Sequence, residues 1–194
     1  GFVYLPQATA VDVRQRAIYN PMNTSGYIVA GLLARFSPDD PGTEDNERYG
    51  YYARFGGGTS ATRYLRIYRI VAGTETQLTT LTISDMNNVW NEIRFDVQQV
   101  SPTETRLRAK IWRFGEAEPE AWDRDIIDSH PDLQNRRGAV GAYGQTSSNR
   151  FLGYRAYNAT LFPFVLADPV TGSREFTGNN VLDVVAFQPP PGYS

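Results

Sequence analysis

Two stretches of the sequence decide the fold: WNEIRFDV at residues 90–97 and RLRAKIW at residues 106–112. In both, apolar residues alternate with polar or charged ones, which is the pattern of a β-strand with one buried face. The segment SPTE at residues 101–104 is typical of a turn between them. We therefore predict an antiparallel hairpin whose core face consists of Ile93, Phe95, Val97, Leu107, Ala109 and Ile111.

The other face of the predicted hairpin carries charges of both signs. Glu92, Arg94 and Asp96 on the first strand face Arg108 and Lys110 on the second, and opposite charges on facing strands attract each other. Glu92 and Asp96 are also the nearest approach in this sequence to the paired carboxylates of a glycosidase. Because Arg94 stands between them, we predict cross-strand ion pairs instead.

Short strands separated by Gly and Pro turns recur along the rest of the chain. We predict them at residues 27–36, 50–55, 64–71, 77–83, 138–143, 154–162 and 181–187. Helical periodicity is poor throughout, and strands do not alternate with helices. Roughly ten short strands of this kind predict an all-β fold, a two-sheet antiparallel β-sandwich or jelly roll.

Composition limits the classes of function. The 194 residues fit a single domain, and 19 basic against 21 acidic side chains give a net charge of -2, so we expect no nucleic-acid partner. No apolar run approaches the roughly 18 residues needed to cross a bilayer, so we expect no membrane insertion. Cysteine is absent, which excludes disulfides and thiolate chemistry, and His130 is the only histidine.

Arginine dominates the basic residues. Lys110 is the only lysine, so 18 of the 19 basic residues are arginine. A GC-rich genome is the simpler explanation. The alternative is a surface selected for the planar, bidentate contacts that guanidinium makes and ammonium does not.

A succession of further motifs extends from the two opening stretches. It consists of GLLAR at residues 31–35, GYYAR at residues 50–54, Gly115, Glu118-Pro119, Trp122, Asp128-Ser129 and GAVG at residues 138–141. This succession resembles the concanavalin A-like lectin/glucanase superfamily, in the LamG-like jelly-roll modules found in bacterial secreted proteins and phage structural proteins. The resemblance implies a concanavalin A-like jelly roll over residues 1–162 of a single domain, followed by an extension over residues 163–194.

The resemblance implies a non-catalytic interaction module that binds glycans or neighbouring proteins. The settings it implies are a phage virion, as a tail- or capsid-associated protein in host attachment, or a bacterial cell surface, where the module could be a homo-oligomer. The alternative is a carbohydrate-active enzyme, a polysaccharide lyase or glycoside hydrolase of the same fold. The Glu-x-Asp-x-x-Glu and Glu-x-Asp-x-Glu runs of catalytic members are missing, and His130 lies in a turn, so we expect no enzyme.

Tyrosine and arginine side chains form the candidate ligand-binding site. Tyr52 and Arg54 share one face of a predicted strand, and Tyr64, Arg66 and Tyr68 share one face of the next. Aromatic rings stack on the apolar faces of sugars while fixed polar groups bind the hydroxyls. The alternative is that these tyrosines pack structurally, with their hydroxyls in water.

The acidic loop SPDDPGTEDNE at residues 37–47 holds the candidate metal ligands Asp39, Asp40, Asp45 and Glu47. Calcium prefers six to eight oxygen ligands, which such a loop can supply. The spacing matches no EF-hand, and we expect a solvated loop, with calcium as the alternative and no other cofactor. A second cluster, Asp123, Asp125, Asp128 and Asp132, is expected to be structural.

The extension over residues 163–194 is too apolar to be left free in water. We expect residues 181–187 to add an edge strand near residues 2–5 of the same chain. The alternative is an assembly arm that docks on a neighbouring subunit by strand addition.

Overall fold

The structure is a computed structural model that describes residues 2–21, 29–37, 48–56, 63–83, 89–145, 149–158 and 174–175. Its strands are β1 (Phe2–Ala10), β2 (Val13–Pro21), β3 (Val29–Ser37), β4 (Tyr49–Gly56), β5 (Arg63–Val71), β6 (Thr74–Ile83), β7 (Asn91–Ser101), β8 (Glu104–Arg113), β9 (Arg124–Asp128), β10 (Gly138–Gln145), β11 (Asn149–Asn158) and β12 (Arg174–Glu175). A 3-10 turn, η2 (Pro131–Leu133), precedes β10.

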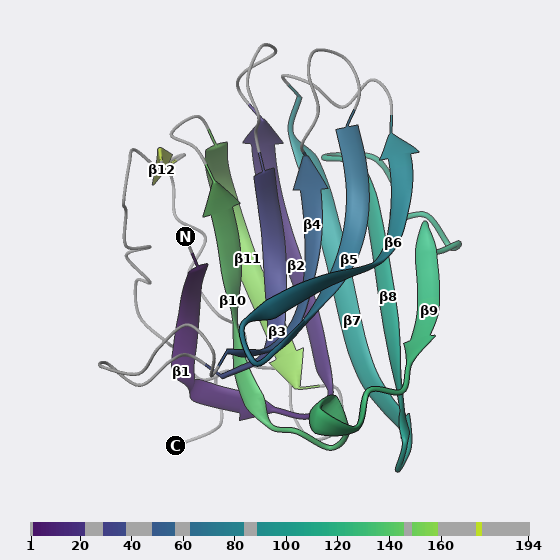
Figure 1. Cartoon of the computed structure of the whole chain (residues 1–194). Coiled ribbons are helices and arrows are strands. Elements are labelled where there is room, and N and C mark those ends of the chain that lie inside the picture. The colour runs from purple at the N-terminus through teal and green to yellow at the C-terminus, as the bar shows by residue number, and fades with distance from the viewer. Residues whose placement is uncertain are drawn as a thin grey trace, which may run out of the picture.

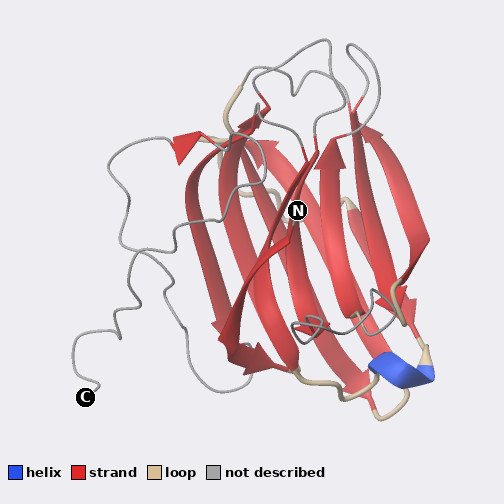
Figure 2. Ribbon diagram, turned by 60° about the vertical axis from the view of Figure 1, so that its left-hand side comes forward, coloured by secondary structure: helices blue, strands red, loops and turns tan. Residues whose placement is uncertain are grey.

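The strands form two antiparallel sheets packed face to face (Figures 1 and 2). Sheet A has the order β1-β10-β3-β4-β5-β6, and sheet B has the order β12-β11-β2-β7-β8-β9. The chain changes sheet between β1 and β2, β2 and β3, β6 and β7, β9 and β10, and β10 and β11, so many sequence neighbours lie in different layers, as in a jelly roll. The predicted all-β, two-sheet antiparallel sandwich is confirmed.

The predicted hairpin is β7–β8. Ile93 lies opposite Ile111, Phe95 opposite Ala109, and Val97 opposite Leu107. All six of these side chains are buried. They pack against side chains of sheet A, among them Leu32, Tyr51, Ala53, Phe55, Leu65 and Ile67, so the alternation in the sequence identified one wall of the core.

Strand β2, at the centre of sheet B, was not predicted from the sequence. Its core face includes Gln15 and the small Ala17, and its outer face includes Ile18. The polar residue inside and the apolar one outside hide the alternation on which a strand prediction depends. Strand β9, a short charged edge strand, was missed for a similar reason.

Arg35 breaks the alternation of β3 and turns into the sandwich. The register of β3 against β4 shifts between Ala34 and Ser37, and Arg35 has a φ of 52°. Its fully buried guanidinium donates hydrogen bonds to the carbonyl of Val11 (2.6 Å), to Oγ1 of Thr105 (2.9 Å) and to the carbonyl of Leu133 (2.8 Å). Burial lowers the pKa of Arg35.

The first and the last described strands lie on different sheets. Residues 2–5 pair with β10 of sheet A, and β12 adds two residues to β11 of sheet B. Residues 181–187, predicted as a strand near residues 2–5, and the acidic loop ligands Asp39, Asp40, Asp45 and Glu47 lie outside the described residues. Within the described part of the chain, no helix is long and apolar enough to cross a membrane.

Candidate functional site

The five candidate binding residues lie together on the outer face of sheet A. Tyr52 pairs with Tyr68 across β4 and β5, and Arg54 pairs with Arg66. Tyr64 lies opposite Gly56 in the same ladder. The alternation of the sequence therefore placed all five on one face of two neighbouring strands.

Tyr52 and Tyr68 form a buried, stacked pair. Their ring centroids are 4.7 Å apart with an interplanar angle of 4°, and they cluster with the buried apolar side chains of Leu33, Phe36 and Ile70. Burial raises the pKa of Tyr52, as does its hydrogen bond to a carboxylate. The two rings are therefore buried in packing on this face of the sheet. This favours the alternative that these two tyrosines have a structural role.

The β5–β6 hairpin supplies the partners of both tyrosine hydroxyls. Tyr52 Oη donates to Oε2 of Glu75 (2.7 Å), and Tyr68 Oη bonds to Oε1 of Gln77 (3.1 Å). The hairpin end bends over the outer side of sheet A (Figure 1), where the amide of Gly73 donates to the carbonyl of Arg48 (2.9 Å). The register of β5 against β6 shifts between the pairs Ile67–Thr79 and Tyr68–Gln77, and this irregularity accompanies the bend.

Tyr64 and Arg66 form the accessible part of the candidate site. Both side chains are partly exposed, and Cζ of Arg66 lies 4.2 Å from the ring centroid of Tyr64. Thr82 pairs with Tyr64 and Thr80 with Arg66 on β6, and both threonines are exposed. We call these four residues the Tyr64–Arg66 patch.

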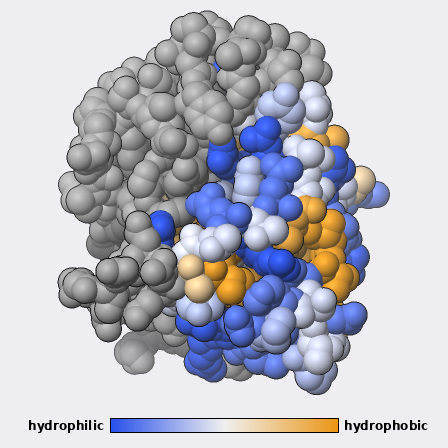
Figure 3. Space-filling model, viewed as in Figure 1, coloured by the Kyte–Doolittle hydropathy of each residue, from blue (hydrophilic) through white to orange (hydrophobic). Residues whose placement is uncertain are grey.

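The Tyr64–Arg66 patch differs in two ways from the prediction. Arg54 is buried, with Cζ 5.6 Å from the ring centroid of Tyr68, so it belongs with the buried pair Tyr52 and Tyr68 and not with the accessible patch. Thr80 and Thr82 were missed, because only the register of β5 against β6 brings them beside Tyr64 and Arg66. On this side of the molecule the described surface is mostly hydrophilic, with small apolar areas between (Figure 3).

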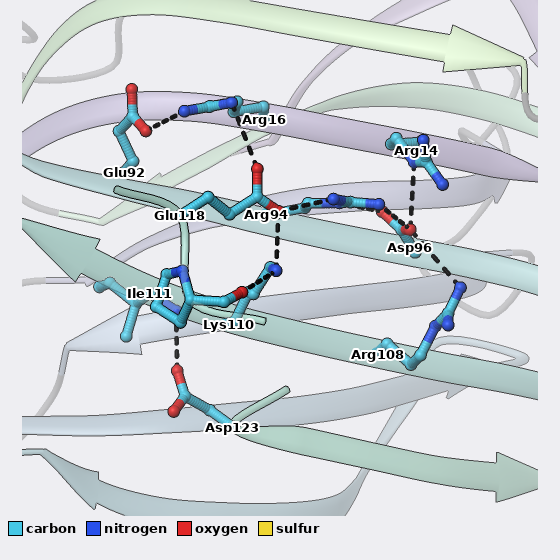
Figure 4. A network of polar contacts seen from close by, with 11 residues as sticks. Arg14, Arg16, Glu92, Arg94, Asp96, Arg108, Lys110, Ile111, Glu118 and Asp123 are labelled. Carbon is cyan, nitrogen blue, oxygen red and sulfur yellow. Dashed lines mark hydrogen bonds and ion pairs between the residues drawn. The ribbon is translucent and has the colours of Figure 1, made fainter. Parts of the chain in front are cut away.

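The outer face of sheet B carries an ion-pair network (Figure 4). Asp96 lies within 3.2 Å of Arg14 on β2, 2.8 Å of Arg94 on its own strand and 3.7 Å of Arg108 on β8. Glu92 pairs with Arg16. Both carboxylates are therefore held by guanidinium groups, as predicted for a charged hairpin face.

The segment of residues 114–123, which follows β8, folds back over this face. Glu118 Oε1 accepts a hydrogen bond from Arg94 (2.6 Å) and lies 2.7 Å from Nζ of Lys110 (Figure 4). Lys110 also donates to the carbonyl of Pro119 (2.5 Å), and Asp123 accepts from the amide of Ile111 (2.8 Å). Burial opposes the charge on Glu118, but hydrogen bonds from Lys110 and Arg94 outweigh it and lower the pKa.

Two tryptophans complete the network. The Trp122 ring centroid lies 4.6 Å from Nζ of Lys110 and 4.8 Å from Cζ of both Arg94 and Arg108. Cζ of Arg16 lies 4.9 Å from the Trp112 ring centroid. Cations over tryptophan faces are attracted by the ring quadrupole. Ion pairs and cation–tryptophan contacts therefore hold the side chains on the outer face of sheet B together.

The acidic cluster that follows Trp122 makes structural contacts in the described residues. Asp125 binds Arg106 through both oxygens, at 2.7 and 2.5 Å. Asp128 is buried and binds Tyr51 Oη (2.9 Å) and Arg69 (2.8 Å). Within the described part of the chain, no group of three or more His, Asp or Glu side chains is placed to hold a metal ion.

No protein-family model and no curated protein matches the sequence. Among the solved structures that are similar to this chain are three with low sequence identity. They are carbohydrate-binding module CBM66 from Bacillus subtilis (12% identity, 73% of each chain, TM-score 0.47), sheep galectin-11 in complex with glycerol (8%, 80% of this chain and 95% of that one, 0.43), and a native heptameric SAP-like pentraxin from Limulus polyphemus (10%, 82% and 68%, 0.43).

Proposed function

We propose that this protein is a non-catalytic module that binds glycans through the Tyr64–Arg66 patch. The carrying observation is a partly exposed tyrosine ring in contact with a guanidinium, on a rigid sheet and beside two exposed threonine hydroxyls. A ring face suits the C–H face of a sugar, and guanidinium and hydroxyl groups suit its oxygens. Tyr52, Tyr68 and Arg54 are buried on the same face of β4 and β5, next to the patch.

The ion pairs of sheet B support the non-catalytic part of this proposal. A glycosidase needs one carboxyl free to protonate the leaving group and a second free to attack or to activate water. Glu92 and Asp96 are instead each engaged by arginine. Turnover of a polysaccharide that disappears in Glu92→Gln or Asp96→Asn would contradict the proposal.

The binding test is a glycan array followed by calorimetric titration of the best neutral ligand. We expect Tyr64→Ala and Arg66→Gln each to weaken binding on the order of tenfold, because each removes one of two principal contacts. The matched control is Tyr49→Ala on the neighbouring strand β4, whose ring lies 4.1 Å from Cζ of Arg136. Equal losses in the control and the patch variants would place binding elsewhere.

We also propose a setting for the module, a phage particle or a bacterial surface assembly with protein as well as glycan partners. The resemblance to LamG-like modules supports this, and tail or capsid genes beside the coding sequence would test it. Deleting residues 180–194 separates the two roles of the extension. Lost stability with an unchanged oligomeric state indicates a closing strand, whereas a stable monomer that no longer assembles indicates an arm.

A further inference from the structure

The ion-pair network of sheet B separates its charges by depth. The side chains of Arg14, Arg106, Arg16 and Arg108 are 50%, 43%, 38% and 21% exposed. Asp96 and Glu92, which bind three of them, are only 4% and 8% exposed. At Arg14, Arg16 and Arg108 solvent therefore meets mainly guanidinium, because Asp96 and Glu92 lie below, whereas Asp125 beside Arg106 and Glu118 are 31% and 28% exposed. We call these four arginines the guanidinium array.

The register of sheet B fixes the layout of the guanidinium array. Arg14 lies opposite Asp96, and Asp96 opposite Arg108, so these three residues form one row across β2, β7 and β8. Arg14 and Arg108 are two strand spacings apart, about 10 Å. Arg16 and Arg106 are each two residues along their strand from this row, about 7 Å. The array thus covers an area that an oligosaccharide of a few units can bridge.

The arginines of the array are held in place before any ligand arrives. Nε of Arg14 donates to Asp96 (3.2 Å), and Arg106 is held by both oxygens of Asp125. A guanidinium has five donors, so such a bond restrains the group and leaves other donors for a planar anion. Restraint before binding lowers the entropy that binding must overcome.

The charge balance points to the class of ligand. The ion-paired residues of this face are six cations and four carboxylates, an excess of two positive charges on a chain whose net charge is -2: Arg14, Arg16, Arg94, Arg106, Arg108, Lys110, Glu92, Asp96, Glu118 and Asp125. Carboxylates among the cations disfavour a dense polyanion such as nucleic acid. They are compatible with a ligand that carries one carboxylate on each of a few spaced units.

We propose that the guanidinium array is a second binding site, on the opposite sheet from the Tyr64–Arg66 patch, for an oligosaccharide of uronic acids. Carboxylates of the sugar would bind Arg14 and Arg106 end on, through the terminal Nη atoms, because Nε of each already donates to Asp96 or Asp125; Arg16 and Arg108 would add charge. The site does not depend on the patch, since the two lie on outer faces of different sheets.

The experiment titrates the full chain with oligogalacturonate and with its methyl ester, which has the same sugar ring but no charge. We expect binding of the acid, none of the ester, and a fall in affinity with added salt. Arg14→Gln and Arg106→Gln should each weaken binding on the order of tenfold. The control is Arg113→Gln, an exposed arginine at the end of β8 that changes the net charge equally, and it should bind like the parent chain.

Three results would overturn the proposal: equal binding of the ester, an equal loss in Arg113→Gln, or tighter binding of a short DNA duplex that the same array variants abolish. Circular dichroism and melting temperature confirm that each variant is folded. Tyr64→Ala should leave oligogalacturonate binding unchanged, so a failure of the patch and a failure of the array are separately visible.

Discussion

The two outer faces of the sandwich are stabilised by different physics. On sheet A, a stacked tyrosine pair is buried in an apolar cluster, and Glu75 and Gln77 of the bent β5–β6 hairpin bind the two tyrosine hydroxyls. On sheet B, ion pairs and cation–tryptophan contacts are covered in part by residues 114–123. A face built by packing should tolerate salt and acid, whereas a face built by charge should not.

The largest expected effect tests packing on sheet A. Tyr52→Ala removes a buried stacked ring and should lower the free energy of unfolding by about 3–5 kcal/mol. Tyr52→Phe keeps the ring and loses the hydrogen bond to Glu75, which should cost about 0.5–1.5 kcal/mol. Urea denaturation measures both, and equal losses in the two variants would show that the hydroxyl, not the ring, stabilises this face.

The next effect tests charge on sheet B. Asp96→Asn leaves three arginines without their shared carboxylate, and we expect a loss of roughly 1–3 kcal/mol, reduced by the exposure of those arginines. Asp132→Asn, at an exposed position outside the network, is the matched control. A neutral or stabilising Asp96→Asn would mean that the network does not contribute to stability.

A smaller effect is expected from acid. The pKa of Glu118 is lowered in the folded chain, so its contribution is present above the unfolded value of about 4.3 and is lost as pH falls through the folded value. Glu118→Gln should therefore flatten the dependence of stability on pH between about 5 and 3, by roughly 1 kcal/mol or less. Glu116→Gln, exposed in the same segment, should keep the parent slope.

The smallest effect concerns the edge where the two sheets meet. Arg124 on β9 donates from Nε to the carbonyl of Thr80 on β6 (3.1 Å), which occupies an acceptor on an edge strand. Arg124→Gln should change stability by no more than about 0.5 kcal/mol. Because free strand edges recruit other strands, sedimentation should show more self-association, and an unchanged distribution would show that Arg124 does not protect this edge.

The sequence predicted which segments are strands and which residues share a face, but not which part of an outer face is buried under another segment. Strict alternation identified the β7–β8 hairpin and placed the candidate tyrosines on one face. It could not show that Tyr52 and Tyr68 are buried, because their cover depends on the bend of the hairpin that carries Glu75 and Gln77. Local pattern contains no information about such a bend.

The guanidinium array was missed for a related reason. Arg14 and Arg16 lie on β2, which was not predicted, because Gln15 faces inward there and blurs the alternation. Arg108 was predicted on the charged face of the hairpin, but its relation to β2 depends on the sheet order. Pairing between strands that are distant in sequence decides the guanidinium array, whereas the Tyr64–Arg66 patch lies within the β5–β6 hairpin.

The inward turn of Arg35 bears on how the chain folds. Its hydrogen-bond acceptors are 24, 70 and 98 residues away in the sequence. Burying the guanidinium away from water costs free energy, and this cost is offset only when all three acceptors are in place to bind it. Closing this end of the sandwich therefore requires three distant segments at once. We expect slow, high-contact-order folding and a single cooperative unfolding transition, in which neither sheet outlasts the other.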